Sequence, residues 1–336
     1  MSASANASVL IPTSRSHFRL VSYVTVIAVE DAMRSVADVD LVDVPQYSRR
    51  ARVRDVVRGR LREPRVTPPR DRYDLGFFVA MDATWIASLR FVEGIRERCS
   101  RVVAYVFDAW LADLAYLRRY RRQWNLCDTV YISYPWAVDA YARELDCEVV
   151  YLPQAASAAH FHPNRVERPI DILSIGRRLP GAHELFLRLA AEHDLFYHYS
   201  EARSPVAYDH GDSQLLLDRL CQSSKAQVCW PVELTTPRAG EGAGVTVRWF
   251  EAAACASVVL GGKPAAPDFD ELFPYPNFVV ELDPNDPAEF ERRVVDALRL
   301  DDRAQRLELA EHVRTHHSWE ARCETMLGRR RVGSAA

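Results

Sequence analysis

The chain alternates between short apolar runs of strand length and longer amphipathic stretches with helical periodicity. In its first half, apolar runs that predict buried strands occupy residues 7–13, 39–44, 73–81, 101–107, 128–133 and 148–153. Stretches that predict helices lie between several of them, at residues 19–36, 86–98 and 137–145. Because buried strands that alternate with helices form parallel sheets, this half predicts a Rossmann-like α/β domain.

A second series of the same kind follows the segment "QAASAAHFHPNRVERP" at residues 154–169, whose small residues and prolines interrupt the alternation. Strands are predicted at 170–176, 195–200, 226–232, 257–260 and 277–282, and helices at 181–193, 213–222, 247–256, 287–300 and in a final region through 327. We therefore predict an α/β protein with two Rossmann-like domains, whose parallel sheets face a central cleft. The expected parts are a first domain, a hinge, a second domain, and a C-terminal helix with a tail, at residues 1–153, 154–169, 170–315 and 316–336.

One predicted helix carries an unexpected polar edge. The segment "EGAGVTVRWFEAAACASVVLGG", residues 241–262, is made of small and apolar residues apart from a few charged and polar ones, with Thr246 as the predicted helix cap. Arg248 and Glu251 lie three residues apart, so they share one face of the helix. A surface ion pair explains such a pair structurally, but a polar edge on a mostly buried helix favours a binding role.

Composition indicates a soluble globular protein. The 336 residues are 48% hydrophobic and 26% charged, and the formal net charge of −3 argues against a dedicated nucleic-acid binder. The N-terminal residues lack a signal-peptide pattern and no apolar run reaches membrane-spanning length, so we expect a cytoplasmic protein.

The histidines and cysteines do not predict a metal site. The seven cysteines never form a CxxC pair, and the pairs His160/His162 and His316/His317 lack the i, i+4 spacing of ligands on a helix. We therefore expect no metal and interpret the cysteines as buried thiols.

Arginines gather at residues 49–72 and again in "RRYRR" at 118–122. Three interpretations of the 49–72 segment remain open: a solvated face, a surface that makes weak contact with anionic membrane lipid, or a binding site for a phosphorylated acceptor.

Five segments resemble those of GT-B glycosyltransferases, especially the bacterial CgeB-like or spore-protein-like family. They span residues 151–327 and read "YLPQAASAAHFHP", "IDILSIGRR", "SSKAQVCW", "VTVRWFEAAACASVVLG" and "HHSWEARCETML". The resemblance implies a GT-B fold whose second domain holds a nucleotide-sugar donor, without a metal or other cofactor. It also implies that Glu251 bonds the nucleotide ribose, and that Arg177 and either Lys225 or Arg248 approach the diphosphate.

Physical chemistry is consistent with these donor contacts. A carboxylate accepts two hydroxyl hydrogen bonds and so suits a ribose diol, while a diphosphate leaving group needs positive charge or N–H donors. Gly244 and Thr246 belong to the glycine-containing segment that leads into a helix N-terminus, where backbone N–H groups and the helix dipole favour an anion. One departure is Ala243, which lies eight positions before Glu251, where the wider retaining GT-B pattern has an acidic residue.

The first domain is expected to bind the acceptor and to supply any base. His17 follows the first predicted strand, and Asp108 ends the strand "VVAYVFD", so a His17–Asp108 dyad would suit an inverting enzyme. Asp82, after "LGFFVAM", is a rival partner and a candidate acceptor-binding residue. Helix capping is the structural alternative for these side chains, and a retaining enzyme would need no such base.

Together these observations predict a transferase that moves a sugar from a nucleoside diphosphate sugar, with UDP or GDP as the nucleotide, to an acceptor hydroxyl. We expect the acceptor to be a small molecule or secondary metabolite; lipid-linked and polysaccharide acceptors remain open. The alternative from another class is a noncatalytic nucleotide- or glycan-binding protein that kept the fold, and Ala243 is the residue that motivates it. An epimerase fits less well, because "IPTSRSHF" contains no glycine and a dinucleotide fingerprint needs three.

Overall fold

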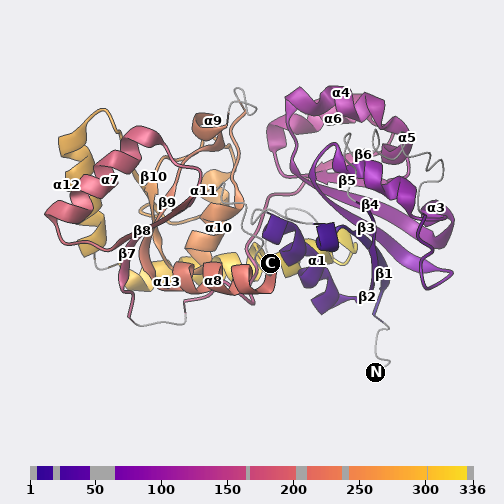
Figure 1. Ribbon diagram of the computed structural model, residues 1–336, viewed down its shortest axis with the longest axis horizontal. Helices are drawn as coiled ribbons and strands as arrows, with labels where there is room; N and C mark the ends of the chain where they lie inside the picture. Colours follow the sequence, from indigo (N-terminus) through magenta and orange to yellow (C-terminus); the bar gives the residue numbers. More distant parts are fainter. Residues whose placement is uncertain are drawn as a thin grey trace.

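The structure, a computed structural model, describes residues 6–17, 23–45, 65–163, 167–201, 210–236, 242–300 and 302–330. Within these ranges the chain forms two α/β domains that lie side by side, drawn in indigo to magenta and in red to orange in Figure 1. The predicted fold class, two α/β domains with parallel sheets, is confirmed.

The N-terminal domain is built on six parallel strands in the order β2-β1-β3-β4-β5-β6. The central strands are apolar and buried on both faces, as parallel strands covered by helices must be. Their bounds are Ser8–Thr13 (β1), Asp38–Asp43 (β2), Tyr73–Asp82 (β3), Cys99–Asp108 (β4), Thr129–Ile132 (β5) and Glu148–Tyr151 (β6). The helices are η1 (Arg15–His17), α1 (Val24–Val36), η3 (Trp85–Phe91), α3 (Ile95–Arg98), η4 (Leu111–Asp113), α4 (Leu114–Arg119), α5 (Arg121–Trp124), η5 (Pro135–Ala137) and α6 (Val138–Glu144).

The C-terminal domain has five parallel strands in the order β11-β10-β9-β7-β8. They are β7 (Ile170–Gly176), β8 (Tyr197–Glu201), β9 (Ser224–Cys229), β10 (Val258–Gly261) and β11 (Val279–Glu281). The helices are α7 (Pro180–Glu192), α8 (His210–Gln222), α9 (Val232–Thr235), α10 (Val247–Ala254), α11 (Phe269–Leu272), α12 (Pro287–Arg299), α13 (Arg303–His316) and α14 (Trp319–Met326).

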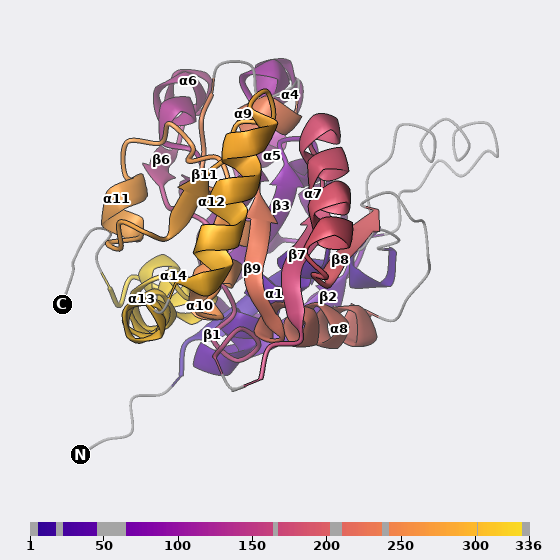
Figure 2. The same ribbon diagram turned by 90° about the vertical axis from the view of Figure 1, so that its left-hand side faces the viewer.

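Each sheet has a hydrophobic core on both of its faces. In the N-terminal domain, neighbouring residues of β3 point to opposite faces: Phe77 packs in the core with α1 and α14, and Phe78 packs in the core under η3 and α6. In the C-terminal domain, α7 and α12 cover one face, as Figure 2 shows, while α10, α11 and α13 pack on the other. Two layers of helix around each sheet leave the strand ends as the places where polar side chains gather.

The C-terminal helix α14 returns to the first domain. Trp319 and Cys323 of this helix are fully buried in the core with α1. Arg322 donates from Nε to the carbonyl of Pro153 at 3.0 Å and from Nη2 to Nδ1 of His317 at 2.8 Å. Since α13 packs on the second domain, the last two helices tie the domains together.

One predicted helix is broken in the structure. Residues 86–98 were expected to form a single helix, but they form a 3-10 helix (Trp85–Phe91) and a short α-helix (Ile95–Arg98). Gly94 lies between them with φ of +63°, a left-handed conformation that glycine adopts readily and that interrupts an α-helix. The short helices α4, α5, α9 and α11 were not predicted from the sequence, because four to six residues carry little periodicity.

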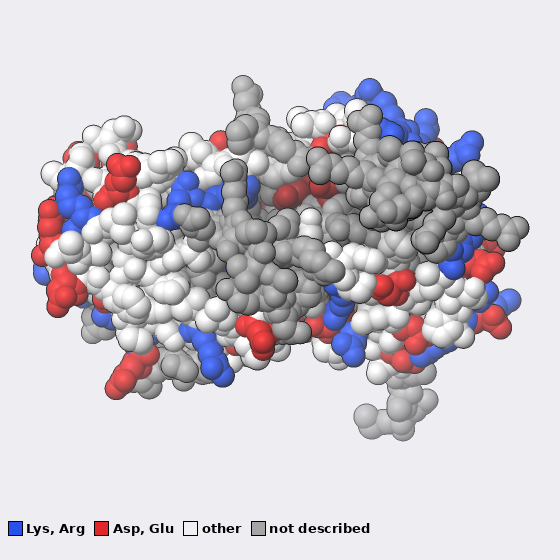
Figure 3. All heavy atoms as spheres, in the orientation of Figure 1, with Lys and Arg blue, Asp and Glu red and all other residues white. Residues whose placement is uncertain are grey.

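The basic clusters are only partly described. Most of the 49–72 arginine segment lies outside the described residues, so its three interpretations stay open. Its described member Arg70 forms an ion pair with Asp38 at 2.7 Å. In "RRYRR", Arg118 and Arg121 pair with Glu144 and Asp146. The side chains of Arg118 and Arg121 are mostly exposed, so these two ion pairs lie on a solvated face. Figure 3 shows basic groups along the upper edge of the N-terminal domain.

Among the described helices, none has both the length and the apolar character needed to cross a bilayer.

Candidate functional site

A cavity of about 400 Å³ lies between the two domains, where the carboxyl ends of their strands meet. The N-terminal domain contributes α1 and the ends of β3 and β4, and the segment after β6 contributes Gln154. The C-terminal domain contributes the ends of β7 and β9, helix α9 and the start of α10. This is the location at which parallel α/β sheets bind ligands, because loops after the strands converge there. The charged residues that line it are Asp108, Arg177 and Arg248.

Arg177 stands at the mouth of the cavity on the C-terminal side. It follows Gly176, which ends β7 with φ of +97°, so the chain turns sharply as it leaves the sheet. The exposed Arg177 side chain donates from Nη1 to the hydroxyl of Thr236, beyond α9. Its neighbour Arg178 turns away and stacks on the ring of Tyr199 at 5.2 Å. The cavity therefore has a guanidinium on its C-terminal wall.

The N-terminus of α10 opens into the same cavity. Thr246 is the first residue outside the helix and lines the cavity, but its side chain does not cap the helix. Instead the side-chain oxygen of Gln154 accepts from the backbone N–H of Val247 at 2.8 Å. Gln154 is buried, and its amide nitrogen lies 3.4 Å from Oγ of Ser133 in the other domain. Sequence analysis missed Gln154, since a glutamine in a segment of small residues carries no pattern.

Arg248 and Glu251 form an ion pair along one side of α10, as their spacing predicts. Arg248 Nη1 lies 2.5 Å from Glu251 Oε2, with 29% and 6% of the side chains exposed. Burial raises the pKa of Glu251 above its ordinary value, and the charge and hydrogen bond of Arg248 oppose that rise. Arg248 lines the cavity, whereas Glu251 lies beneath it. A ligand therefore meets Arg248 first.

The glycine-containing segment before α10 packs against aromatic rings of the N-terminal domain. A Cβ atom on Gly244 would lie 2.3 Å from the ring of Tyr134, and one on Gly242 would lie 2.4 Å from the ring of Trp136. These two rings stack with centroids 5.6 Å apart, and Tyr134 also packs on Trp110. Only glycine allows this close approach of backbone to rings, so Gly242 and Gly244 permit a contact between the domains.

On the N-terminal side, Asp108 ends β4 and lines the cavity. The Tyr134 hydroxyl lies 3.5 Å from its Oδ1. Burial raises the pKa of Tyr134; the negative charge of Asp108 adds to the rise, and the positive charge of Arg177 opposes it. The charges of Asp108 and Arg177, which lie on opposite walls of the cavity, therefore both act on the pKa of Tyr134.

The other two candidates of the N-terminal domain lie differently. Asp82 pairs in register with Asp108 at the end of β3, where it accepts from the backbone N–H of Thr84 at 2.9 Å, as a turn cap does. His17 is exposed and lies 3.8 Å from Asp43. It is not among the residues that line the cavity, and its ionic partner is Asp43 rather than Asp108, so these contacts do not form the expected dyad.

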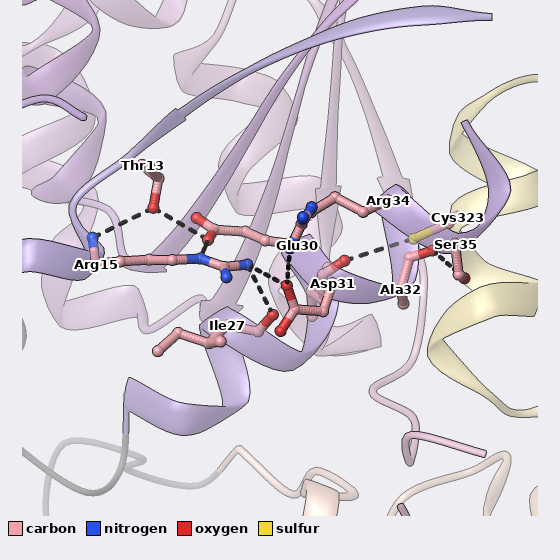
Figure 4. A network of polar contacts seen from close by, with 10 residues as sticks. Thr13, Arg15, Ile27, Glu30, Asp31, Ala32, Arg34, Ser35 and Cys323 are labelled. Carbon is pink, nitrogen blue, oxygen red and sulfur yellow. Dashed lines mark hydrogen bonds and ion pairs between the residues drawn. The ribbon is translucent and has the colours of Figure 1, made fainter. Parts of the chain in front are cut away.

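An ionic cluster links the segment after β1 to helix α1 (Figure 4). Glu30 of α1 is buried, forms an ion pair with Arg15, and accepts from Thr13 Oγ1 at 3.0 Å. Arg15 also pairs with Asp31 at 2.8 Å. Burial raises the pKa of Glu30 to about 7, even though Arg15 favours its ionised form. Sequence analysis missed this cluster because charged residues on an amphipathic helix usually face solvent.

Lys225 is a correction to the donor residues expected from sequence. It is the second residue of β9, at the amino end of the strand, whereas the cavity lies at the carboxyl end. Its ammonium group pairs with Asp171 at 2.6 Å. A parallel strand separates its two ends by its full length, so Lys225 does not approach a ligand in this cavity.

Within the described parts of the chain, no group of three or more histidine, cysteine, aspartate or glutamate residues is arranged to hold a metal ion.

Comparison with known proteins identifies the fold. Residues 217–328 match a family model described as glycosyl transferase-like. No curated protein matches the chain significantly. An alpha-glucosyltransferase in complex with UDP and a 13-mer DNA matches with a TM-score of 0.55 and 11% identity, over 95% of this chain and 97% of the other.

Two further solved structures match over nearly their full length. The alpha,alpha-trehalose 6-phosphate synthase of Burkholderia multivorans has a TM-score of 0.52 and 10% identity, over 97% of this chain and 98% of the other. Anabaena HepE in complex with UDP has a TM-score of 0.52 and 9% identity, over 96% and 98%. The resemblance noted in the sequence is thus confirmed at the level of the fold: the chain has the GT-B fold, and its residues 217–328 match the model of a glycosyl transferase-like family.

Proposed function

We propose that this protein is a glycosyltransferase that takes a sugar from a nucleoside diphosphate sugar bound in the interdomain cavity. One observation carries the proposal: the cavity joins the N-terminus of α10, Arg177 and Arg248 on one wall to Asp108 on the other. The first three favour a diphosphate, and the carboxylate suits an acceptor hydroxyl. A GT-B fold and a glycosyl transferase-like domain at residues 217–328 support this assignment.

The donor diphosphate is proposed to bind between Arg177 and the start of α10. Positive charge is needed there because negative charge develops on the leaving diphosphate as the glycosidic bond breaks. Arg177 is exposed at the cavity mouth, and Arg248 lines the wall beside Thr246. Gln154 now accepts the N–H of Val247, so a phosphate oxygen at this helix end would take the place of the Gln154 amide oxygen. Gly244 holds the segment close enough for such contacts.

Glu251 is proposed to bind the nucleotide ribose, as the resemblance implies. Its pairing with Arg248 and its burial mean that it reaches a ribose only after the Arg248 side chain turns toward the diphosphate. The Glu251→Gln variant is a better test than alanine, because it keeps the side-chain volume and retains one hydrogen-bonding oxygen. We expect weaker nucleotide binding in calorimetry; unchanged affinity would remove the ribose assignment.

For the acceptor side, we propose Asp108 as the group that receives the proton of the attacking hydroxyl or orients that hydroxyl. It lines the cavity and is positioned by the end of β4, beside the register partner Asp82. His17 remains a weaker candidate for the base, because it lies beside Asp43 and not beside Asp108. The His17→Ala variant should then retain most of the turnover, whereas Asp108→Asn should lose at least about a hundredfold, the lower range for a general base.

UDP is the first nucleotide to try, because two structures of the same fold contain it. GDP is the second nucleotide to try. We also propose that the acceptor is a small molecule, that the enzyme acts without a metal or other cofactor, and that the protein is cytoplasmic. Lipid-linked and polysaccharide acceptors are kept as alternatives for the same chemistry.

The first experiment is a thermal-shift screen against UDP, GDP, dTDP, ADP and their sugar conjugates. A ligand at about 100 times its dissociation constant stabilises the folded chain by roughly 2.7 kcal/mol, which is readily detected. A shift with one base supports the donor site, and release of that nucleoside diphosphate from its sugar conjugate supports transfer or hydrolysis. Binding without any turnover would favour the noncatalytic alternative, for which Ala243 is the specific observation. No shift with any nucleotide would overturn the donor site.

A further inference from the structure

A second hollow, of about 210 Å³, lies at the opposite edge of the C-terminal sheet from the interdomain cavity. It is formed where the chain enters β7, β9 and β10, together with the end of α12 and the start of α13. Four cationic side chains line it: Arg168, Lys225, Arg303 and Arg306. The other lining residues are apolar: Ala256, Ala297, Leu298 and Leu307. The amino end of a parallel sheet does not usually bind substrate, so these cations need a separate explanation.

Two of the four cations are neutralised by neighbouring carboxylates. Lys225 pairs with Asp171 at 2.6 Å, and Arg306 pairs with Asp302 at 2.7 Å. The charges of these two cations are therefore compensated within the fold.

The other two cations have no carboxylate partner among the described residues. Arg168 is half-buried and donates to three backbone carbonyls, those of Ser224 (3.0 Å), Cys255 (2.5 Å) and Ala256 (2.9 Å). These bonds fix the position of Arg168 and cap the C-terminal end of α10. The carbonyl groups are neutral, so only the negative end of the helix dipole offsets the charge of Arg168. Arg303 is exposed, and no hydrogen bond or ion pair to it is found within the described residues.

The four charges also repel one another. Burial lowers the pKa of Arg168, and the positive charges of Arg306 and Arg303 lower it further. A half-buried guanidinium with like charges beside it costs free energy that a bound anion would offset. The hollow therefore carries a surplus of two positive charges over its described carboxylates, one on Arg168, which is held by backbone carbonyls, and one on the exposed Arg303.

The size of the hollow limits the anion. Its volume equals that of about seven water molecules and falls below the range of about 300–1,000 Å³ typical of sites for whole small molecules. Guanidinium groups bind phosphate oxygens through paired N–H donors, and a lysine adds a point charge. We propose that this hollow is a phosphate-binding site, separate from the interdomain cavity, which takes inorganic phosphate or the phosphate group of a small soluble ester.

Calorimetric titration of the full chain with inorganic phosphate, against chloride at matched ionic strength, tests this proposal. We expect saturable binding of one phosphate, weakened about tenfold or more by Arg303→Ala and abolished by Arg303→Glu. The exposed Arg299 at the end of α12 does not line the hollow, so Arg299→Glu is the matched control and should bind as the parent does. Since Arg303 makes no described hydrogen bond or ion pair and its charge repels Arg168, neither Arg303 variant should lower the melting temperature.

The Arg177→Ala variant distinguishes this site from the interdomain cavity, the other place where phosphate would meet arginine side chains. Phosphate binding that survives Arg177→Ala and is lost in Arg303→Glu supports the proposal, whatever the fate of the donor site. Absence of saturable binding at tens of millimolar phosphate, or binding lost in Arg177→Ala but kept in Arg303→Glu, would overturn it. Glycerol phosphate in a parallel titration separates the two sources: equal affinity indicates an ester, and a strong preference for inorganic phosphate indicates the free ion.

Discussion

Two adjacent arginines after β7 face different surroundings, and this difference makes them a matched pair for mutation. Arg177 lines the interdomain cavity, whereas Arg178 stacks on Tyr199 and contacts His183. A hydrogen bond to a charged group contributes about 1.5–3 kcal/mol, so Arg177→Ala should weaken binding of a nucleoside diphosphate by about ten- to a hundredfold. Isothermal titration calorimetry with UDP measures the change. Arg178→Ala should leave the affinity within about twofold; equal losses in both variants would contradict the assignment.

The carboxyl group of Glu30 is expected to titrate near neutral pH, because burial raises its pKa. Its pKa rises from an ordinary value of 4.5 to about 7 in the folded chain, so the folded chain binds this proton more tightly than the unfolded chain does. The contribution of Glu30 to stability is therefore largest below about pH 4.5, and it falls as the pH rises toward 7. A shift of this size corresponds to about 3 kcal/mol.

The Glu30→Gln variant tests this dependence, because glutamine does not titrate. Chemical denaturation at pH 5 and pH 8 gives the free energies of unfolding of both proteins. We expect the parent chain to lose more stability than Glu30→Gln between these two pH values. A parallel dependence in the two proteins would show that Glu30 does not titrate in this range.

Individual residues show where sequence patterns are sufficient for a site and where they are not. Arg177 and Arg248 were expected near the donor, and both line the interdomain cavity. Arg177 could be placed because it directly follows a predicted strand. Lys225 was wrong because its apolar run was predicted at 226–232, so the lysine appeared as a loop residue, whereas it lies inside β9 at the amino end. Gln154 reaches α10 from the interdomain segment, across 93 residues of sequence, and no local pattern records such a contact.

The segment that enters α10 shows how an element depends on another domain. Gly244 lies against the Tyr134 ring, and an added Cβ would lie 2.3 Å from a ring atom of this buried tyrosine. The Gly244→Ala variant must therefore move the segment away from the N-terminal domain. We expect a lower melting temperature and at least about tenfold weaker nucleotide binding, because overpacking of this kind costs about 1–3 kcal/mol.

Gly181 provides the control for this variant. It lies in the first turn of α7, and an added Cβ would meet only Pro284, at 3.9 Å. The Gly181→Ala variant should keep or slightly raise the melting temperature, since alanine favours the helix by up to about 1 kcal/mol. The same calorimetry compares the nucleotide affinities of Gly244→Ala and the parent. Equal affinities would show that the contact with Tyr134 does not position the segment.

Elements were predicted well where a single physical preference determines them. Apolar runs such as those of β3 and β4 were recognised because buried parallel strands need apolar side chains on both faces. The break at Gly94 was missed, because a helical pattern on both sides of a glycine does not reveal a left-handed backbone. Short helices such as α9 depend on tertiary contacts and leave no periodic signal.

At the scale of the whole molecule, the last two helices of the chain pack in the cores of different domains. After α13 packs on the C-terminal domain, α14 inserts Trp319 into the N-terminal core, where its ring lies 5.5 Å from that of Tyr105 and 5.4 Å from that of Phe107. Phe107 also lines the interdomain cavity. The C-terminal helix therefore supports the wall on which the acceptor is proposed to bind.

The Trp319→Ala variant tests this coupling. Removing a fully buried tryptophan typically costs about 3–5 kcal/mol, and here the loss falls on the N-terminal core although the residue is near the C-terminus of the chain. Denaturant unfolding, followed by far-ultraviolet circular dichroism, should show a transition at a lower denaturant concentration than in the parent. If the two domains unfold separately, the N-terminal domain should unfold first. Trp319→Phe keeps an aromatic ring in the core and should lose much less. Truncation of a core residue that packs against Tyr105 and Phe107 should cost stability, so a Trp319→Ala midpoint equal to that of the parent would show that α14 contributes little to the N-terminal domain.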